Sequence, residues 1–258
     1  MTYLPKTAPE LERFKKAASE TIGAVSLFRD GVNNYISEVC KLRELSISNH
    51  PLYDQIVRRR IIPFAFSDSL LLYGSLANQN AYPQIINLAA ILFGCAGAMI
   101  LSLENHYVFR GSVEIGIGAQ LKDREIYGPV LVSAYDLEKH VASYPRIVIG
   151  KGVIEYLISV SHCAFSDPIV ADFIKSCIND CRSLIWGDDD GNPILDFLGP
   201  FVRERLKKLG WYETSVRTGF KFVETELTRF KQEANEKLAS KYERLQNYFV
   251  KRAGSILM

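Results

Sequence analysis

The sequence lacks the cysteine and histidine patterns of disulfide-linked or zinc-binding proteins. Its 258 residues include only 5 Cys and 4 His, and no two cysteines have the Cys-x-x-Cys spacing. Because the number of cysteines is odd, a disulfide framework would leave one thiol unpaired. We therefore expect reduced, mostly buried thiols and no zinc site, as is usual for a cytosolic protein.

A disordered composition and a strong net charge are also absent. The chain has only 17 Gly and 10 Pro, and 48% of its residues are hydrophobic, which excludes a collagen or a low-complexity scaffold. The net charge of +2 does not make the whole surface attractive to nucleic acid, so no nucleic-acid partner is expected. The first 20 residues contain no apolar signal-peptide core, so we expect a cytoplasmic protein.

Charge is missing altogether from one long stretch. No Asp, Glu, Lys or Arg lies between Asp68 and Glu104, and the 19 residues 85–103 are almost entirely apolar. That length is close to what spans a bilayer. However, its Gly and Ala residues suit close packing inside a protein, and basic or aromatic anchors do not stand on both flanks. We expect a buried helix and no membrane span.

The remaining pattern predicts alternating strands and helices, which together indicate an α+β fold. The strands are expected at 22–28, 61–66, 69–73, 110–118, 128–132 and 144–150, with hairpin turns at 67–69 and 122–125. The helices are expected at 8–20, 32–45, 83–104 and 133–140. This order is typical of a ferredoxin-like or palm-type core with a mixed sheet and flanking helices.

The C-terminal part is predicted to be one long helix from about residue 215. Its apolar residues recur every three or four positions and form a narrow stripe. Residues 203–252 hold 13 Lys and Arg against 7 Asp and Glu. The stripe is expected to pack on the rest of the chain, and a coiled-coil-like dimer seam is the alternative. The expected domains are an N-terminal helix (1–20), a catalytic domain (21–185) and a helical appendage (186–258).

Two carboxylates stand where metal ligands are expected. Asp30 follows the first expected strand and Asp68 lies at the tip of the hairpin, so neighbouring strands would bring them to one end of the sheet. Carboxylates with phosphate oxygens suit Mg²⁺ or Mn²⁺. Gly31 would begin a helix whose backbone N–H groups could hold a polyphosphate. The alternative is that both aspartates are ordinary turn residues.

A third acidic group, Asp188–Asp190, resembles the start of a calcium loop. Asn192 and Ile194 do not continue the ligand pattern, and no Glu closes it. We therefore predict a solvated turn at this position.

Four segments of the chain resemble the catalytic domain of class III nucleotide cyclases. They are AVSLFRDGVNNYIS (24–37), IIPFAFSDSLLLY (61–73), FRGSVEIGIGA (109–119) and YGPVLVSAYDLEKHVASYPRIVI (127–149). The resemblance covers roughly residues 20–160. It implies that Asp30 and Asp68 hold two Mg²⁺ or Mn²⁺ ions, and that Gly31 and Val32 contact the triphosphate of a bound nucleotide.

The base-binding positions depart from the family pattern. The family's purine-reading Lys falls on Phe64, which can pack on a base but cannot hydrogen-bond to a purine edge. Its acidic partner falls on Glu125, which can accept from uracil N3–H or cytosine N4–H. Tyr135 would either stack on the base or, as we favour, fill the core. These residues favour a pyrimidine nucleotide.

The transition-state residues of the family are also replaced. Its Asn falls on Val132 and its Arg on Asp136, so a cation must come from elsewhere in the chain. The candidates are Arg58, Arg60 and Arg146, together with Arg59 and Arg110. The alternatives are a solvated strand end for the arginine run and a structural ion pair for Arg146.

The chain most resembles the bacterial pyrimidine cyclases of Pycsar antiphage systems, whose cyclic UMP or cyclic CMP activates a separate effector. This implies a homodimer with composite active sites that converts UTP, or less favourably CTP, to the 3′,5′-cyclic monophosphate and pyrophosphate. One alternative is a purine cyclase. The other is a catalytically inactive cyclase-like module that binds a nucleotide or a partner.

Overall fold

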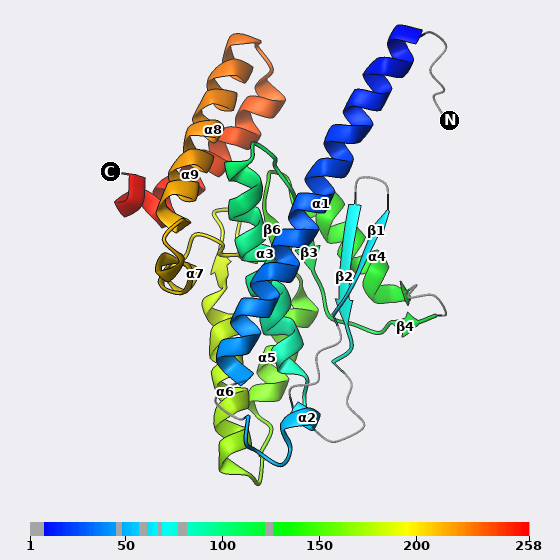
Figure 1. Ribbon diagram of the computed structural model, residues 1–258, viewed down its shortest axis with the longest axis vertical. Helices are drawn as coiled ribbons and strands as arrows, with labels where there is room; N and C mark the ends of the chain where they lie inside the picture. The colour runs from blue at the N-terminus through cyan, green and yellow to red at the C-terminus, as the bar shows by residue number, and fades with distance from the viewer. Residues whose placement is uncertain are drawn as a thin grey trace.

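The computed structural model describes residues 8–44, 48–56, 61–66, 69–76, 82–121 and 126–257 (Figure 1). The helices are α1 (Ala8–Glu44), α2 (Tyr53–Ile56), α3 (Ile85–Glu104), α4 (Pro129–Asp136), α5 (Lys151–Ser161), α6 (Pro168–Ser183), α7 (Pro200–Leu206), α8 (Tyr212–Gln232) and α9 (Glu236–Leu257). A π-helical turn (Leu137–Val141) continues α4, and a 3₁₀ turn (Lys207–Leu209) follows α7. The strands are β1 (Ile61–Phe66), β2 (Ser69–Gly74), β3 (Gly111–Val113), β4 (Ala119–Gln120), β5 (Ile126–Tyr127), β6 (Ile147–Ile149), β7 (Ile185–Gly187) and β8 (Pro193–Leu195). The expected α+β class is confirmed.

Helix α3 lies at the centre of the fold. Nearly all of its side chains are buried, and α1, α6 and α8 pack around it (Figure 1). A helix enclosed on all sides has apolar residues all round instead of an amphipathic stripe. The helix is long and apolar enough to cross a membrane, and 89% of its most apolar 18-residue window is buried inside the protein. The buried helix expected at this position is confirmed.

Residues 22–28, which were expected to form a strand, are part of the 37-residue helix α1. One face of this helix packs along α3 (Figure 1). The buried side chains of that face are Ala24, Val25, Phe28 and Val32. Because β preference depends strongly on packing context, burial of this helical stripe outweighs the strand preference of the β-branched residues. The expected domain boundary at residues 20 and 21 therefore falls inside a helix.

The hairpin expected from residue 61 to 73 is confirmed. Strands β1 and β2 pair antiparallel, from Ile61 opposite Gly74 to Phe66 opposite Ser69. Ser67 and Asp68 of the expected turn lie outside the described residues.

In the described part of the chain, a four-stranded sheet has the order β3-β6-β8-β7. Strands β3 and β6 are parallel and are connected through the β4–β5 pair and α4, whereas β8 runs antiparallel to β6 and to β7. The strand expected at 144–150 is confirmed as β6, and that at 110–118 is present only as the short β3. The expected boundary at residues 185 and 186 cuts through β7, so the sheet includes chain from both sides of it.

The C-terminal region is a helical hairpin, not the single long helix expected. Helices α8 and α9 pack against each other, and α8 also packs on α3 (Figure 1). The chain reverses at Ala234, whose φ is +51°, and the Oδ1 of Asn235 accepts a hydrogen bond from the Leu238 N–H at 3.2 Å. Because apolar residues keep a three-to-four spacing on both sides of the turn, the stripe alone could not reveal the break. The expected packing of the tail on the rest of the chain is confirmed.

Candidate functional site

Glycines allow the chain after β3 to lie close to the start of α4. Gly128 has a φ of +144°, and a Cβ there would lie 2.7 Å from the Ile117 carbonyl oxygen. A Cβ at Gly118 would lie 3.0 Å from Val130, whose N–H donates to Ile117 O at 3.2 Å. Only glycine is compatible with that φ and that close approach at position 128. Pro129 then begins α4, which is why residues 128–132 do not form the strand end that was expected.

Helix α4 and the π-helical turn present an exposed face. Val132, Tyr135 and Asp136 are exposed on it, and the Lys139 Nζ lies 5.3 Å from the centre of the Tyr135 ring. At 56% exposure, Tyr135 does not fill the core, contrary to the favoured expectation, because none of the α4 side chains is buried. An exposed aromatic ring beside an ammonium group can stack on a base and pair with a phosphate.

The candidate transition-state arginines differ in their surroundings. Arg146 is buried, and its guanidinium bonds to the carboxylates of Asp188 and Asp190, so it has the structural ion pair weighed as the alternative. The Nε of Arg110 lies 2.5 Å from the Oε1 of Glu138, which ties the β3 segment to the π-helical turn. Arg58, Arg59 and Arg60 lie outside the described residues.

The acidic turn Asp188–Asp190 is the expected solvated turn only in part, because Asp189 and Asp190 are exposed whereas the Asp188 side chain is held by internal partners. The Asp188 side chain is only 7% exposed, and it accepts a hydrogen bond from the Tyr144 hydroxyl at 2.8 Å. The Oδ2 of Asp190 accepts from Arg146 at 2.6 Å and from Arg244 at 2.9 Å. These two guanidinium groups hold the pKa of Asp190 well below its ordinary value, with Arg146 the stronger influence.

Helix α9 supplies the other cations of this cluster. Its Arg252 Nε donates to the buried Asp196 carboxylate at 3.0 Å, and its Lys251 Nζ lies 2.5 Å from Asp189. The guanidinium groups of Arg146 and Arg244 lie 4.8 and 4.6 Å from the centre of the Tyr144 ring. We name the residues that join the β7–β8 region to α9 the ionic cluster: Tyr144, Arg146, Asp188, Asp189, Asp190, Asp196, Arg244, Lys251 and Arg252. Sequence reasoning missed these pairs, although the excess of Lys and Arg in the tail indicated that acidic partners were needed.

The remaining predicted site residues are not brought together. Asp30 lies within α1 with its side chain 63% exposed, 3.2 Å from the Nε of Arg29, and not at the end of a strand. Gly31 and Val32 lie in the contact between α1 and α3, where a Cβ on Gly31 would be 3.1 Å from the side chain of Leu101. Phe64 lies partly exposed in β1. Asp68 and Glu125 lie outside the described residues.

The described residues do not form the implied site for two metal ions. Within the described ranges, no group of three His, Cys, Asp or Glu side chains is placed to hold a metal ion. Asp30 offers one exposed carboxylate on a helix, already close to Arg29. Divalent ions with catalytic roles need several oxygen ligands around one point, so Asp30 does not form the implied Mg²⁺ or Mn²⁺ site by itself, and the other expected ligand, Asp68, lies outside the described residues.

Comparison of the chain with protein-family models, with curated proteins and with solved structures found no match.

Proposed function

We propose that this chain is a nucleotide cyclase that acts on a pyrimidine nucleoside triphosphate. In this reaction the ribose 3′-oxygen attacks the α-phosphorus, the 3′-hydroxyl proton is released, and pyrophosphate leaves. The products are a 3′,5′-cyclic monophosphate and pyrophosphate. UTP is the preferred substrate over CTP. The cyclic nucleotide would serve as a second messenger for a separate effector in antiphage defence.

The observation that carries the proposal is the order of elements from β1 to β6. A hairpin, the helix α3, the strand β3, a second strand pair, the helix α4 and the strand β6 follow in the order of the last three cyclase-like segments, whereas the first segment lies in α1. Gly128 supports the alignment because it occupies the glycine position before the helix of the fourth segment and its φ of +144° favours glycine.

The exposed face of α4 supports a nucleotide as the ligand. Val132 and Asp136, the positions aligned with the family's transition-state residues, lie on this face with Tyr135 and Lys139. In β1, the partly exposed Phe64 offers apolar surface and no hydrogen-bond donor to a purine edge. These side chains support pyrimidine over purine nucleotides. A homodimer with composite sites would bring the missing cation from a second chain.

A second candidate function is a cyclase-like module that binds a nucleotide without converting it. The position of Asp30 favours this candidate, because an exposed carboxylate on a continuous helix does not form the expected metal site. The burial of Gly31 and Val32 against α3 opposes the triphosphate contacts that the cyclase resemblance implies for them.

The test is to incubate the purified chain with each of the four ribonucleoside triphosphates and Mn²⁺, and to identify products by mass spectrometry. We expect cyclic UMP or cyclic CMP. The resemblance assigns the metal ions to Asp30 and Asp68, so on the cyclase proposal Asp30→Ala and Asp68→Ala each abolish product. The exposed Asp172 on α6 provides the control, because Asp172→Ala should retain activity.

The outcomes separate the candidates. Saturable nucleotide binding without any cyclic product, in a protein whose dimer is intact, supports the non-catalytic module and overturns the cyclase. Cyclic AMP or cyclic GMP as the main product would keep the cyclase and overturn the pyrimidine preference. Activity that survives both aspartate substitutions would show that these residues do not hold the metal ions.

A further inference from the structure

Strand β7 lies at the end of the described four-stranded sheet and has no partner strand among the described residues on its outer edge. It pairs only with β8 in the described sheet, where Ile185 lies opposite Leu195 and Gly187 lies opposite Pro193. The hydrogen bonds to β8 flank these two residues, since Leu184 O accepts from Asp196 N and Asp188 N donates to Asn192 O. Because bonded residues alternate along an antiparallel pair, Ile185 and Gly187 direct their peptide N–H and C=O groups away from β8. Such an edge can accept an additional strand.

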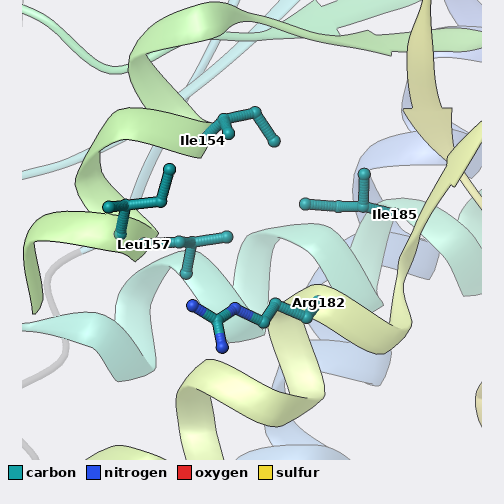
Figure 2. Close-up of a pocket in the computed structure, with 5 residues that line it drawn as sticks. Ile154, Leu157, Arg182 and Ile185 are labelled. Atoms are coloured by element: carbon teal, nitrogen blue, oxygen red, sulfur yellow. The ribbon is translucent and has the colours of Figure 1, made fainter. Parts of the chain in front are cut away.

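An apolar pocket of about 160 Å³ lies beside this edge (Figure 2). Figure 2 shows Ile154 and Leu157 of α5 on one side and Ile185 of β7 on the other, and Ile158 completes the apolar lining. Ile158 is 48% exposed, so the pocket is open to a partner. The volume is well below the few hundred Å³ of a typical cofactor or drug site and suits a single aliphatic side chain.

A cation lies at the border of the pocket. Arg182, in the last turn of α6, extends its guanidinium along the side between α5 and β7 (Figure 2). Among the described residues, its side chain has no hydrogen bond, ion pair or ring contact. An arginine in this setting can pair with a carboxylate that arrives with an apolar side chain.

We propose that the β7 edge and its pocket bind an extended, acidic segment of a partner protein as an added strand. The segment's backbone pairs with Ile185 and Gly187, one aliphatic side chain fills the pocket, and a neighbouring carboxylate pairs with Arg182. Since side chains two residues apart share a face of a strand, the carboxylate belongs two positions from the aliphatic residue. This proposal is independent of the proposed catalytic function.

The charge of the surface favours a foreign acidic segment over a second copy of this chain. In a symmetric dimer the same patch meets itself, so Arg182 would approach its own copy. That arrangement brings like charges together, whereas an acidic segment compensates the guanidinium.

The probe is an acetylated and amidated heptapeptide of sequence Thr-Glu-Thr-Leu-Thr-Glu-Thr, in which both glutamates share a face with the leucine. We expect saturable binding to the full chain by calorimetry. Arg182→Gln should weaken binding about tenfold, the typical effect of losing a charge-assisted hydrogen bond. Replacing both glutamates by glutamine should weaken binding to the wild-type chain but have little further effect on the Arg182→Gln variant.

Gly187→Pro tests the backbone pairing separately. Its N–H points away from β8, and a Cβ at this position meets no atom within 4 Å, so proline removes an edge donor without losing a bond to β8. We expect this variant to fold and to lose peptide binding. Lys151→Gln, which removes an exposed cation from α5 outside the pocket, is the matched control and should bind like the wild-type chain.

Three results would overturn the proposal. The first is an absence of saturable peptide binding, or equal binding by the wild-type chain, Arg182→Gln and Gly187→Pro. The second is a dimer that forms without peptide and is broken by Gly187→Pro, which would identify a second copy as the occupant. The third is tight binding of octanoate that blocks the peptide and is insensitive to Gly187→Pro, which would identify a small amphiphile.

Discussion

Two parts of the core differ in whether buried charges are added to their apolar contacts. Helix α3 is buried by apolar contacts with α1, α6 and α8, and its sequence carries no charge from Ile85 to Leu103. Helix α9 also packs apolar side chains, such as Tyr248 and Phe249, on the sheet region. In addition it joins that region through the ionic cluster, in which Arg146, Asp188 and Asp196 are largely buried. Apolar contacts tolerate many neighbours, whereas buried charges are favourable only with particular partners.

This difference predicts different responses to substitution. Removing one member of the ionic cluster leaves another charge buried and unpaired, which costs far more than the loss of an exposed ion pair. A substitution in the contact around α3 changes the volume of a buried side chain, so its effect on stability depends on the space available at that position.

The largest effect is expected for Arg146→Ala. The buried Asp188 would lose its guanidinium partner, so the free energy of unfolding should fall by about 3–5 kcal/mol. The measurement is chemical denaturation followed by circular dichroism. Lys207→Ala removes an exposed ion pair with Glu213 and serves as the control, with an expected loss below about 1 kcal/mol. Equal losses for the two variants would contradict the distinction between buried and exposed pairs.

Two glycines of α1 provide a sharper comparison at the apolar contact. A Cβ at Gly23 meets no atom within 4 Å, so Gly23→Ala should stabilise the helix by about 0.5–1 kcal/mol. At Gly31 the space is taken by Leu101 and Ala98, so Gly31→Val should destabilise by about 1–3 kcal/mol. Thermal denaturation of both variants shows whether each substitution raises or lowers the melting temperature. Destabilisation by Gly23→Ala would contradict the continuous helix through this segment.

A smaller effect on stability is expected for a substitution in the turn between α8 and α9. Ala234 has a φ of +51°, a conformation that glycine adopts without the steric cost of a Cβ. Ala234→Gly should therefore stabilise the chain by about 1 kcal/mol, as a shift of the denaturation midpoint. A loss of stability would mean that α8 and α9 continue as one helix.

The ionic cluster also predicts a pH dependence. Because the folded-state pKa of Asp190 is lowered, its contribution to stability is present above its unfolded pKa of about 3.8 and is lost as the pH falls toward the folded value. The difference in stability between the wild-type chain and Asp190→Asn should therefore be constant near neutral pH and shrink below about pH 4. A difference that does not change down to pH 2 would contradict the lowered pKa.

The sequence predicted the structure correctly where the residues of one segment are sufficient to determine its conformation and burial. The charge-free run predicted the buried α3, and the turn residues between apolar runs predicted the β1–β2 hairpin. It was misleading at residues 22–28, because the helix there is stabilised by contact with α3, which is distant in the chain. The partners of Arg146 could not be predicted for the same reason, since they lie more than 40 residues away.

The same limit applies to the candidate site. Gly128, which directly precedes α4, was recognised from its place in a cyclase-like segment, and its φ of +144° gives the physical reason for glycine there. The role of Asp30 was inferred from an expected strand end, and the helix α1 places its carboxylate elsewhere. Tyr135 is exposed because α4 lies on the outside of the sheet region, which the local pattern does not reveal.

The most direct test of the proposed function is the product formed by the purified wild-type chain from an equimolar mixture of ATP, GTP, CTP and UTP with Mn²⁺. We predict cyclic UMP as the main product, with cyclic CMP the less favoured possibility. The absence of any cyclic nucleotide from a folded, nucleotide-binding protein would contradict the cyclase proposal.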